Sequence, residues 1–149
     1  MRLFIAIPLP PHARRAALAA QRALIAAGAT GRFVPDENFH ITLRFIGESE
    51  RLVDITQAMQ EAVRDIRPCL LRLAGYDGFA QGEGRTAHIA IAYDEEFQRL
   101  YESLDYALGA RGFPRARSRL IPHITLGRHV KGDEGFDWRD PKASFLAGE

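Results

Sequence analysis

Cysteine is almost absent from this chain of 149 residues, because Cys69 is the only one. A single cysteine excludes an intrachain disulfide and any zinc or iron–sulfur site that needs several thiolates. Long hydrophobic runs are also missing. The apolar stretch at residues 3–7 is far shorter than the roughly 18 residues of a membrane span, and no signal-peptide cleavage site follows it. We therefore expect a cytoplasmic protein that does not enter a membrane.

An excess of charge of either sign is missing as well. The chain has 20 basic and 19 acidic side chains, so its formal net charge is +1. Tracking a long nucleic-acid strand needs many surplus cations on one face, and this balance gives no reason to expect it. The basic residues are 18 arginines and 2 lysines. Arginine binds phosphate oxygens better than lysine does, because its planar guanidinium donates two parallel hydrogen bonds. With 46% hydrophobic residues, the composition predicts one domain over residues 1–149.

The hydrophobic periodicity predicts an α+β protein. Apolar residues at helical spacing predict helices at residues 12–27, 52–66 and 95–110. Alternating or β-branched segments predict strands at residues 2–7, 32–34, 39–46, 69–76, 86–93 and 121–127.

The two halves of the chain resemble each other. The tetrapeptide His-Ile-Thr-Leu occurs at residues 40–43 and again at 123–126, each time after a strand and a helix. The offset between the halves is 84 residues at Ile5 and Ile89 and 83 residues at His40 and His123. An identical motif in the same order of elements at the same offset indicates two related αβ units with pseudo-twofold symmetry.

The period of two in a strand places the histidine and the threonine of each motif on one face and the apolar residues on the other. Two such strands that face each other across a cleft bring together His40, Thr42, His123 and Thr125. Such a set suits phosphoryl chemistry without a metal. One neutral imidazole accepts a proton from water, one imidazolium donates a proton to the leaving oxygen, and the hydroxyls hold non-bridging oxygens.

Two arginines follow the motifs and are candidates for binding phosphate. Arg44 has the same strand parity as His40, so it points toward the same face. Arg128 has the opposite parity to His123 and reaches that face only if the strand bends near Gly127, where a bulge is plausible. A solvated strand arginine is the alternative interpretation for Arg44.

The other histidines, His12, His88 and His129, are interpreted as surface or structural residues. The sequence has no His-Glu-x-x-His motif and no carboxylate cluster at ligand spacing beyond the turn before His40, so we expect neither a metal nor a cofactor.

The paired motifs, the opening Arg-Leu-Phe-Ile-Ala-Ile, the stretch of residues 33–47 and the stretch of residues 122–128 together resemble the two-histidine phosphoesterase superfamily. Within it, the chain is similar to the bacterial and archaeal RNA 2′,3′-cyclic phosphodiesterases, also called 2′-5′ RNA ligases. The resemblance covers roughly residues 1–130. It implies a bilobal fold with antiparallel sheets lining a central cleft and helices on the outer faces.

The resemblance also implies an activity and roles for the residues. It implies metal-independent hydrolysis of a terminal 2′,3′-cyclic phosphate to a 2′-phosphate and a weak, reversible 2′-5′ joining reaction on RNA. His40 corresponds to the general acid and His123 to the base. Thr42 and Thr125 correspond to phosphate-binding residues, and Arg128 to an arginine beyond the second motif.

The expected substrates are RNA ends or small cyclic nucleotides. We expect the protein to be a monomer. Two alternatives stay open: a relative that opens the cyclic phosphate of a small nucleotide or ADP-ribose derivative, and a member that binds nucleotides or RNA without turnover. The resemblance further implies two strands after the second motif. Residues 131–149 contain no alternating apolar run, so we expect these strands to be missing or shortened.

Overall fold

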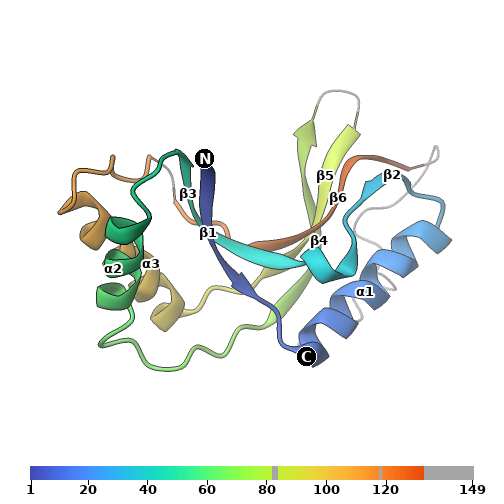
Figure 1. The fold of residues 1–149 in the computed structure, drawn as a ribbon. Coiled ribbons are helices and arrows are strands. Elements are labelled where there is room, and N and C mark those ends of the chain that lie inside the picture. Colours follow the sequence, from blue (N-terminus) through green and yellow to red (C-terminus); the bar gives the residue numbers. More distant parts are fainter. Residues whose placement is uncertain (82–83, 118, 133–149) are drawn as a thin grey trace. The chain divides into compact units, whose positions relative to one another are not determined.

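The computed structural model describes residues 1–81, 84–117 and 119–132 (Figure 1). The expectation about strands after residue 131 falls on residues 133–149, which lie outside the described residues.

The described chain contains six strands, three α-helices and one 3-10 turn, and its strand pairs are antiparallel. The strands are β1 (Arg2–Pro8), β2 (Thr30–Phe33), β3 (His40–Glu48), β4 (Leu73–Gln81), β5 (Gly84–Ile91) and β6 (His123–Lys131). The helices are α1 (Pro11–Ala26), α2 (Leu52–Ala62) and α3 (Glu95–Gly109), and the 3-10 turn η1 is Asp36–Asn38. The predicted α+β class is confirmed. The strand expected at residues 69–76 begins only at Leu73.

The chain divides into two compact units that do not coincide with the two halves of the sequence. Unit 1 consists of Met1–Ile5, Leu43–Leu71 and Tyr93–Ile121. Unit 2 consists of Ala6–Thr42, Arg72–Ala92 and the chain from Pro122 onward. Each unit therefore takes segments from both halves, and α1 and α3, the matching helices of the repeat, lie in different units. That residues 1–149 act as one domain stays a prediction.

In unit 1, α2 and α3 pack against each other through small and apolar side chains. Ala58 and Ala62 of α2 are buried, as are Leu104 and Leu108 of α3. Small side chains at this spacing allow two helices to approach closely. The start of α3 is fixed by Asp94, whose carboxylate accepts a hydrogen bond of 2.9 Å from the backbone N–H of Phe97.

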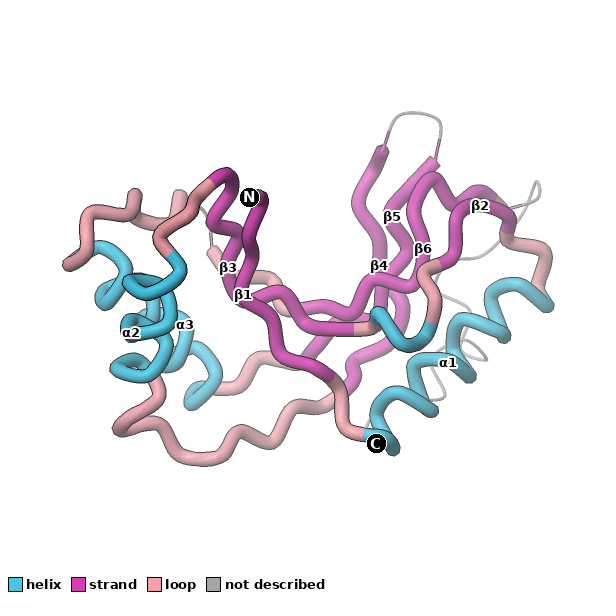
Figure 2. Tube along the Cα trace, viewed as in Figure 1, coloured by secondary structure: helices cyan, strands magenta, loops and turns pink. Residues whose placement is uncertain are grey.

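In unit 2, β6 is the central strand. β5 pairs with β6 on one edge, and β4 pairs with β5 (Figure 2). The other edge of β6 is shared, because β3 pairs with its beginning at Ile41–Ile124 and β2 pairs with its later part at residues 127–131. Residues opposite one another in register share a face of the sheet. One row of the buried face therefore consists of Ile41, Ile124, Ile89 and Tyr76.

Helix α1 covers this apolar face of unit 2. The Tyr76 hydroxyl donates a hydrogen bond of 2.6 Å to the carbonyl of Ala20, in the middle of α1. From the same helix, the buried Gln21 amide donates to the carbonyls of Val34 at 2.7 Å and Leu126 at 2.9 Å. Helix and sheet are thus joined by polar contacts as well as apolar packing, and the other face of the sheet is left for function. Within the described residues, no helix is long and apolar enough to cross a membrane.

Candidate active site

The histidine and the threonine of both His-Ile-Thr-Leu motifs lie in unit 2, at the beginnings of β3 and β6. Ile41 lies directly opposite Ile124 in an antiparallel pair. Both isoleucines are buried, so the residues on either side of them, His40, Thr42 and their counterparts in β6, point to the face opposite the buried one. These four side chains are half-buried. The antiparallel direction brings His40 to the side of Thr125 and Thr42 to the side of His123.

This arrangement differs from one detail of the sequence interpretation. We expected the two motif strands to face each other across a cleft, but β3 and β6 are hydrogen-bonded neighbours in one sheet. The physical reason is that each motif carries apolar residues on the alternate positions, which allows both strands to bury the same face. The two imidazoles and two hydroxyls therefore converge from adjacent strands of a single surface.

The bend near Gly127 on which the orientation of Arg128 depends is present as a register slip. His88 of β5 lies opposite Thr125, and Ala87, the next residue, lies opposite Gly127, so β6 has one extra residue at this point. A Cβ atom on Gly127 would approach the side chains of Phe33 and Val130 to 3.0 Å and 2.8 Å, respectively, which places this position on the buried face.

The slip changes the face to which the following residue points. With Gly127 on the buried face, Arg128 points to the face of His123 and Thr125, as the sequence interpretation required. A second irregularity follows, where β6 again has an additional residue relative to β5 and to β2. His129 there adopts a left-handed backbone conformation with φ 53°.

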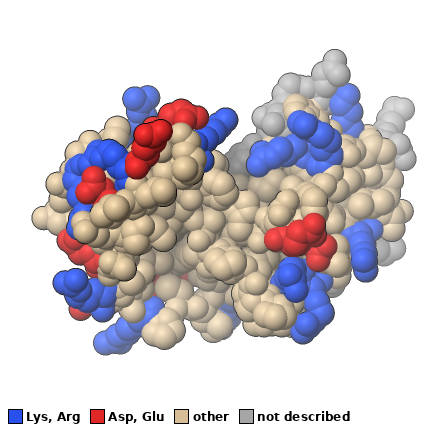
Figure 3. All heavy atoms as spheres, viewed as in Figure 1, with Lys and Arg blue, Asp and Glu red and all other residues tan. Residues whose placement is uncertain are grey.

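Arg128 has a basic neighbour. Arg32 of β2 lies directly opposite Arg128, and both side chains are exposed. Like charges directly opposite in a sheet are unfavourable unless an anion lies between them. Figure 3 shows basic side chains gathered over the strands of unit 2 in the region where Figure 1 places β2, β5 and β6.

The turn before β3 orients the ring of His40. Pro35 and the 3-10 turn lead directly into this strand, and His40 Nδ1 lies 2.7 Å from the carbonyl oxygen of Asn38. Because a carbonyl oxygen only accepts, Nδ1 carries the proton and donates. A proton transfer by His40 would therefore involve its other ring nitrogen, Nε2.

A third histidine belongs to this group, although the sequence interpretation assigned it to the surface or to a structural role. His88 is 1% exposed, and its ring centroid lies 4.5 Å from that of His123. Burial, and after it the nearby His123, lower the pKa of His88 from 6.5 to about 4, while Asp77 and a backbone hydrogen bond with Thr86 oppose the shift. His88 is therefore neutral near pH 7. His12 and His129 are exposed, as expected.

Arg44 occupies a different environment from the other predicted residues. It belongs to unit 1, where its guanidinium forms an ion pair of 2.7 Å with Asp105 and also donates to the carbonyl of Pro114. Partial burial would raise the pKa of Asp105. Hydrogen bonds from the Ala116 N–H, Arg115 and Arg44 nevertheless lower that pKa to about 2. The guanidinium of Arg44 is thus held within unit 1, and binding of phosphate by this residue stays a prediction.

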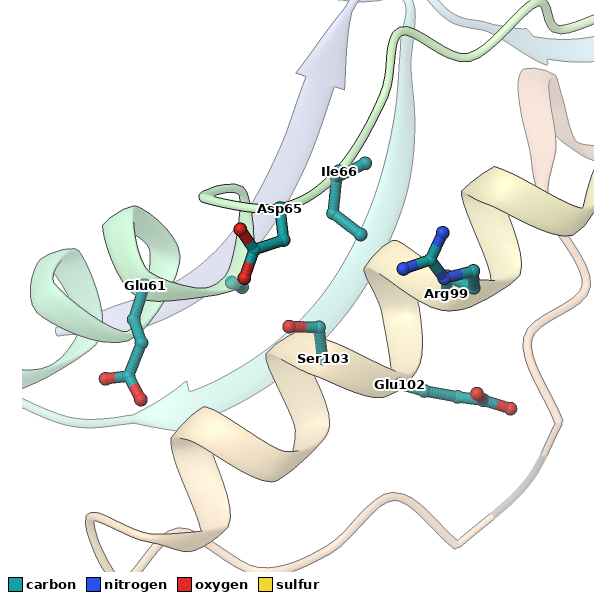
Figure 4. A pocket seen from close by; sticks show the side chains of 7 residues that line it. Glu61, Asp65, Ile66, Arg99, Glu102 and Ser103 are labelled. Atoms are coloured by element: carbon teal, nitrogen blue, oxygen red, sulfur yellow. The ribbon is translucent and has the colours of Figure 1, made fainter.

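A hollow of about 380 Å³ lies between α2 and α3 in unit 1 (Figure 4). Glu61, Asp65, Arg99, Glu102 and Ser103 line it. Three carboxylates make it a poor site for a phosphate, and Arg99 is bound to Glu96 at 2.7 Å. None of the predicted site residues lines this hollow. Among the residues that the structure describes, no group of three or more His, Cys, Asp or Glu side chains is arranged to hold a metal ion.

Comparison with known proteins agrees with this geometry. The sequence model of the 2′-5′ RNA ligase superfamily matches residues 9–137. The chain belongs to this superfamily. It is 31% identical to an RNA 2′,3′-cyclic phosphodiesterase of Methanothermobacter thermautotrophicus, over 100% of this chain and 79% of that protein.

Solved structures also match. TT0787 of Thermus thermophilus superimposes with a TM-score of 0.69 at 29% identity, covering 87% of this chain and 74% of that one. E. coli LigT complexed with phosphate superimposes with a TM-score of 0.59 at 26% identity, covering 85% of this chain and 70% of that one. The resemblance inferred from the motifs is confirmed.

Sequence reasoning did not place His88 beside His123 or Arg32 beside Arg128. The alternation of residues 86–93 put His88 on a strand, but its place beside His123 depends on the pairing of β5 with β6. Arg32 precedes the first motif by eight residues and reaches Arg128 only through the pairing of β2 with β6.

Proposed function

We propose that this chain is an RNA 2′,3′-cyclic phosphodiesterase, which opens the cyclic phosphate at an RNA end to a 2′-phosphate. One observation carries the proposal. His40, Thr42, His123 and Thr125 project from adjacent strands of one unit to the same face of the sheet. Two imidazoles and two hydroxyls around one point match the needs of a phosphodiester hydrolysis, with an acid, a base and donors for the phosphoryl oxygens.

The relatives support the choice of substrate. The protein of Methanothermobacter thermautotrophicus is named for RNA 2′,3′-cyclic phosphate, and LigT of E. coli has been solved with phosphate. In this chain, Arg128 lies on the face of the two motifs beside Arg32. Two guanidiniums there favour an anionic substrate.

In the proposed reaction, His123 acts as the base and His40 as the acid. His123 takes a proton from water, and the water oxygen forms a bond to phosphorus. The bond between phosphorus and the ribose 3′ oxygen breaks, and His40 Nε2 donates its proton to that oxygen. The product carries a 3′-hydroxyl and a 2′-phosphate. Each correctly placed acid or base contributes on the order of a hundred- to ten-thousandfold to the rate.

The hydrogen bond between His40 and Asn38 supports the acid role. With Nδ1 donating to the carbonyl of Asn38, the ring of His40 is held in place and Nε2 is the nitrogen that delivers a proton to the substrate. Thr42 and Thr125 donate to the non-bridging oxygens. Arg128 balances the charge that those oxygens carry.

The test is turnover of a 2′,3′-cyclic nucleotide and of a short RNA with a 2′,3′-cyclic end, in the presence of a chelator. We expect hydrolysis of both, with the 2′-phosphate as product and a higher kcat/KM for the RNA. Phosphorus NMR distinguishes a 2′-phosphate from a 3′-phosphate. Absence of turnover, or a 3′-phosphate product, contradicts the proposal. A higher kcat/KM for the mononucleotide or for an ADP-ribose cyclic phosphate assigns the site to a small-molecule substrate.

A further inference from the structure

His88 is a buried polar ring that the proposed reaction does not use directly. It is 1% exposed on β5, opposite Thr125, and its ring centroid lies 4.5 Å from that of His123 with 42° between the ring planes. An apolar side chain at this position would avoid the cost of burying an imidazole. Its place against a candidate catalytic histidine is thus the feature that calls for a function.

A carboxylate lies on the other side of His88. Asp77 of β4 is directly opposite His88 of β5, so Asp77, His88 and Thr125 form one row across three strands. The titratable and charged groups of this face, from the strands around His88, are Asp77 of β4, His40 of β3, and His123 and Arg128 of β6. Arg85 of β5 has the opposite parity to His88 and points to the face of Ile89. Burial keeps His88 itself neutral, with a pKa of about 4.

We propose that His88 is a positioning residue that orients the imidazole of His123 and stabilises it when it accepts the proton of water. This inference rests on the proposed function. The neutral imidazole of His88 has a π system and one unprotonated nitrogen, and both interact favourably with a positive charge on the neighbouring His123. The negative charge of Asp77 acts in the same direction through His88. The interaction strengthens only when His123 becomes positive, so it lowers the barrier more than it tightens substrate binding.

The experiment compares the wild type with His88→Phe, which keeps an aromatic ring but removes the polar nitrogens. We expect kcat to fall about tenfold, while KM stays within about twofold. The acid limb of the kcat/KM profile moves to lower pH, because the base has lost the group that favours its charged form. A purely structural role moves neither this limb nor the ratio of kcat to KM.

Two further variants complete the test. Ile89→Val is the matched control, because Ile89 is the next residue of β5 and faces the buried side. It lowers the melting temperature without changing kcat or the pH profile. Asp77→Asn is a substitution at an exposed position, so its folding is not in question. It lowers kcat two- to threefold and moves the acid limb in the same direction, and it carries the test if His88→Phe does not fold.

The outcomes separate this inference from the proposed function. A wild type without turnover overturns both. An active wild type whose His88→Phe variant keeps its kcat and pH profile overturns this inference alone. If His88→Phe does not fold, an Asp77→Asn variant with the kinetics of the wild type also overturns this inference alone. The expected kcat loss and limb shift, together with an unchanged KM, establish His88 as a positioning residue.

Discussion

Ile41 of β3 lies directly opposite Ile124 of β6, and this single pair aligns the two copies of the repeated tetrapeptide. Because both side chains are buried, their neighbours in each strand are presented on the opposite face. The repeat therefore has a structural reason: apolar alternate positions bury one face, and polar alternate positions place two histidines and two threonines on the other.

Removing either motif histidine tests the acid–base pair. We expect His40→Ala and His123→Ala each to lower kcat by at least about a hundredfold on a 2′,3′-cyclic nucleotide, because each removes one proton-transfer group. His12→Ala serves as the control, since His12 is exposed on α1 and is expected to leave the rate unchanged. Rates near that of the wild type in both motif variants would falsify the acid–base proposal.

Arg128 and Arg32 are expected to affect binding more than chemistry. Arg128→Ala raises KM for a cyclic-phosphate-ended RNA about tenfold, because a charge-assisted contact to phosphate is lost. Arg32→Ala raises KM less and reduces its dependence on salt concentration. Arg15→Ala, a change at an exposed position on α1, is the control. If the three variants have the same KM as the wild type, at low salt and at high salt, this assignment is wrong.

The buried His88 makes stability depend on pH. Its folded pKa of about 4 lies below its usual value of 6.5, so the unfolded chain binds the proton more tightly. Burial of neutral His88 therefore causes no pH-dependent loss of stability above about pH 6.5. As the pH falls toward 4, the unfolding free energy of the wild type decreases by about 3 kcal/mol because of this residue. His88→Phe lacks this part of the loss. Urea unfolding of both proteins at pH 7, 5.5 and 4 measures this loss. If the unfolding free energy depends on pH in the same way in the wild type and in His88→Phe, the prediction is wrong.

Asp105 is expected to be a stabilising residue of unit 1. It accepts hydrogen bonds from Arg44, Arg115 and the Ala116 N–H, each at 2.7 to 2.9 Å. We expect Asp105→Asn to cost about 1–3 kcal/mol at pH 7, because these donors lose a charged acceptor. The lowered pKa of Asp105 means that the wild type keeps this contribution above about pH 4 and loses it toward pH 2. Chemical denaturation of the wild type and of Asp105→Asn at pH 7 and near pH 2 measures the difference in their unfolding free energies, which we expect to disappear near pH 2.

Gly127 is expected to permit the register slip beside Thr125. A Cβ atom there would lie 2.8 Å from Val130 Cγ2 and 3.0 Å from Phe33 Cδ1, which is closer than side chains tolerate. Gly127→Ala therefore lowers stability by about 1–3 kcal/mol. Adding Phe33→Leu relieves one of these two contacts and restores part of the loss. Thermal unfolding of the single and double variants tests this, and an alanine variant as stable as the wild type contradicts it.

The sequence by itself determined the class of fold, the two motifs and the common face to which the histidine and the threonine of each motif point. These depend on local periodicity: the strand alternation that buries Ile41 also fixes the direction of His40, wherever the strand lies in the sheet. The same reasoning stated the condition for Arg128, a bend near Gly127, because parity along a strand is a property of the chain alone.

Only the tertiary structure decided which strands are neighbours. The pairing of β5 with β6 brings His88 to His123, and the pairing of β2 with β6 brings Arg32 to Arg128. The fold also placed Arg44 against Asp105, a residue 61 positions away. Such contacts depend on register and on hydrogen bonds between segments far apart in the chain, and local periodicity does not contain that information.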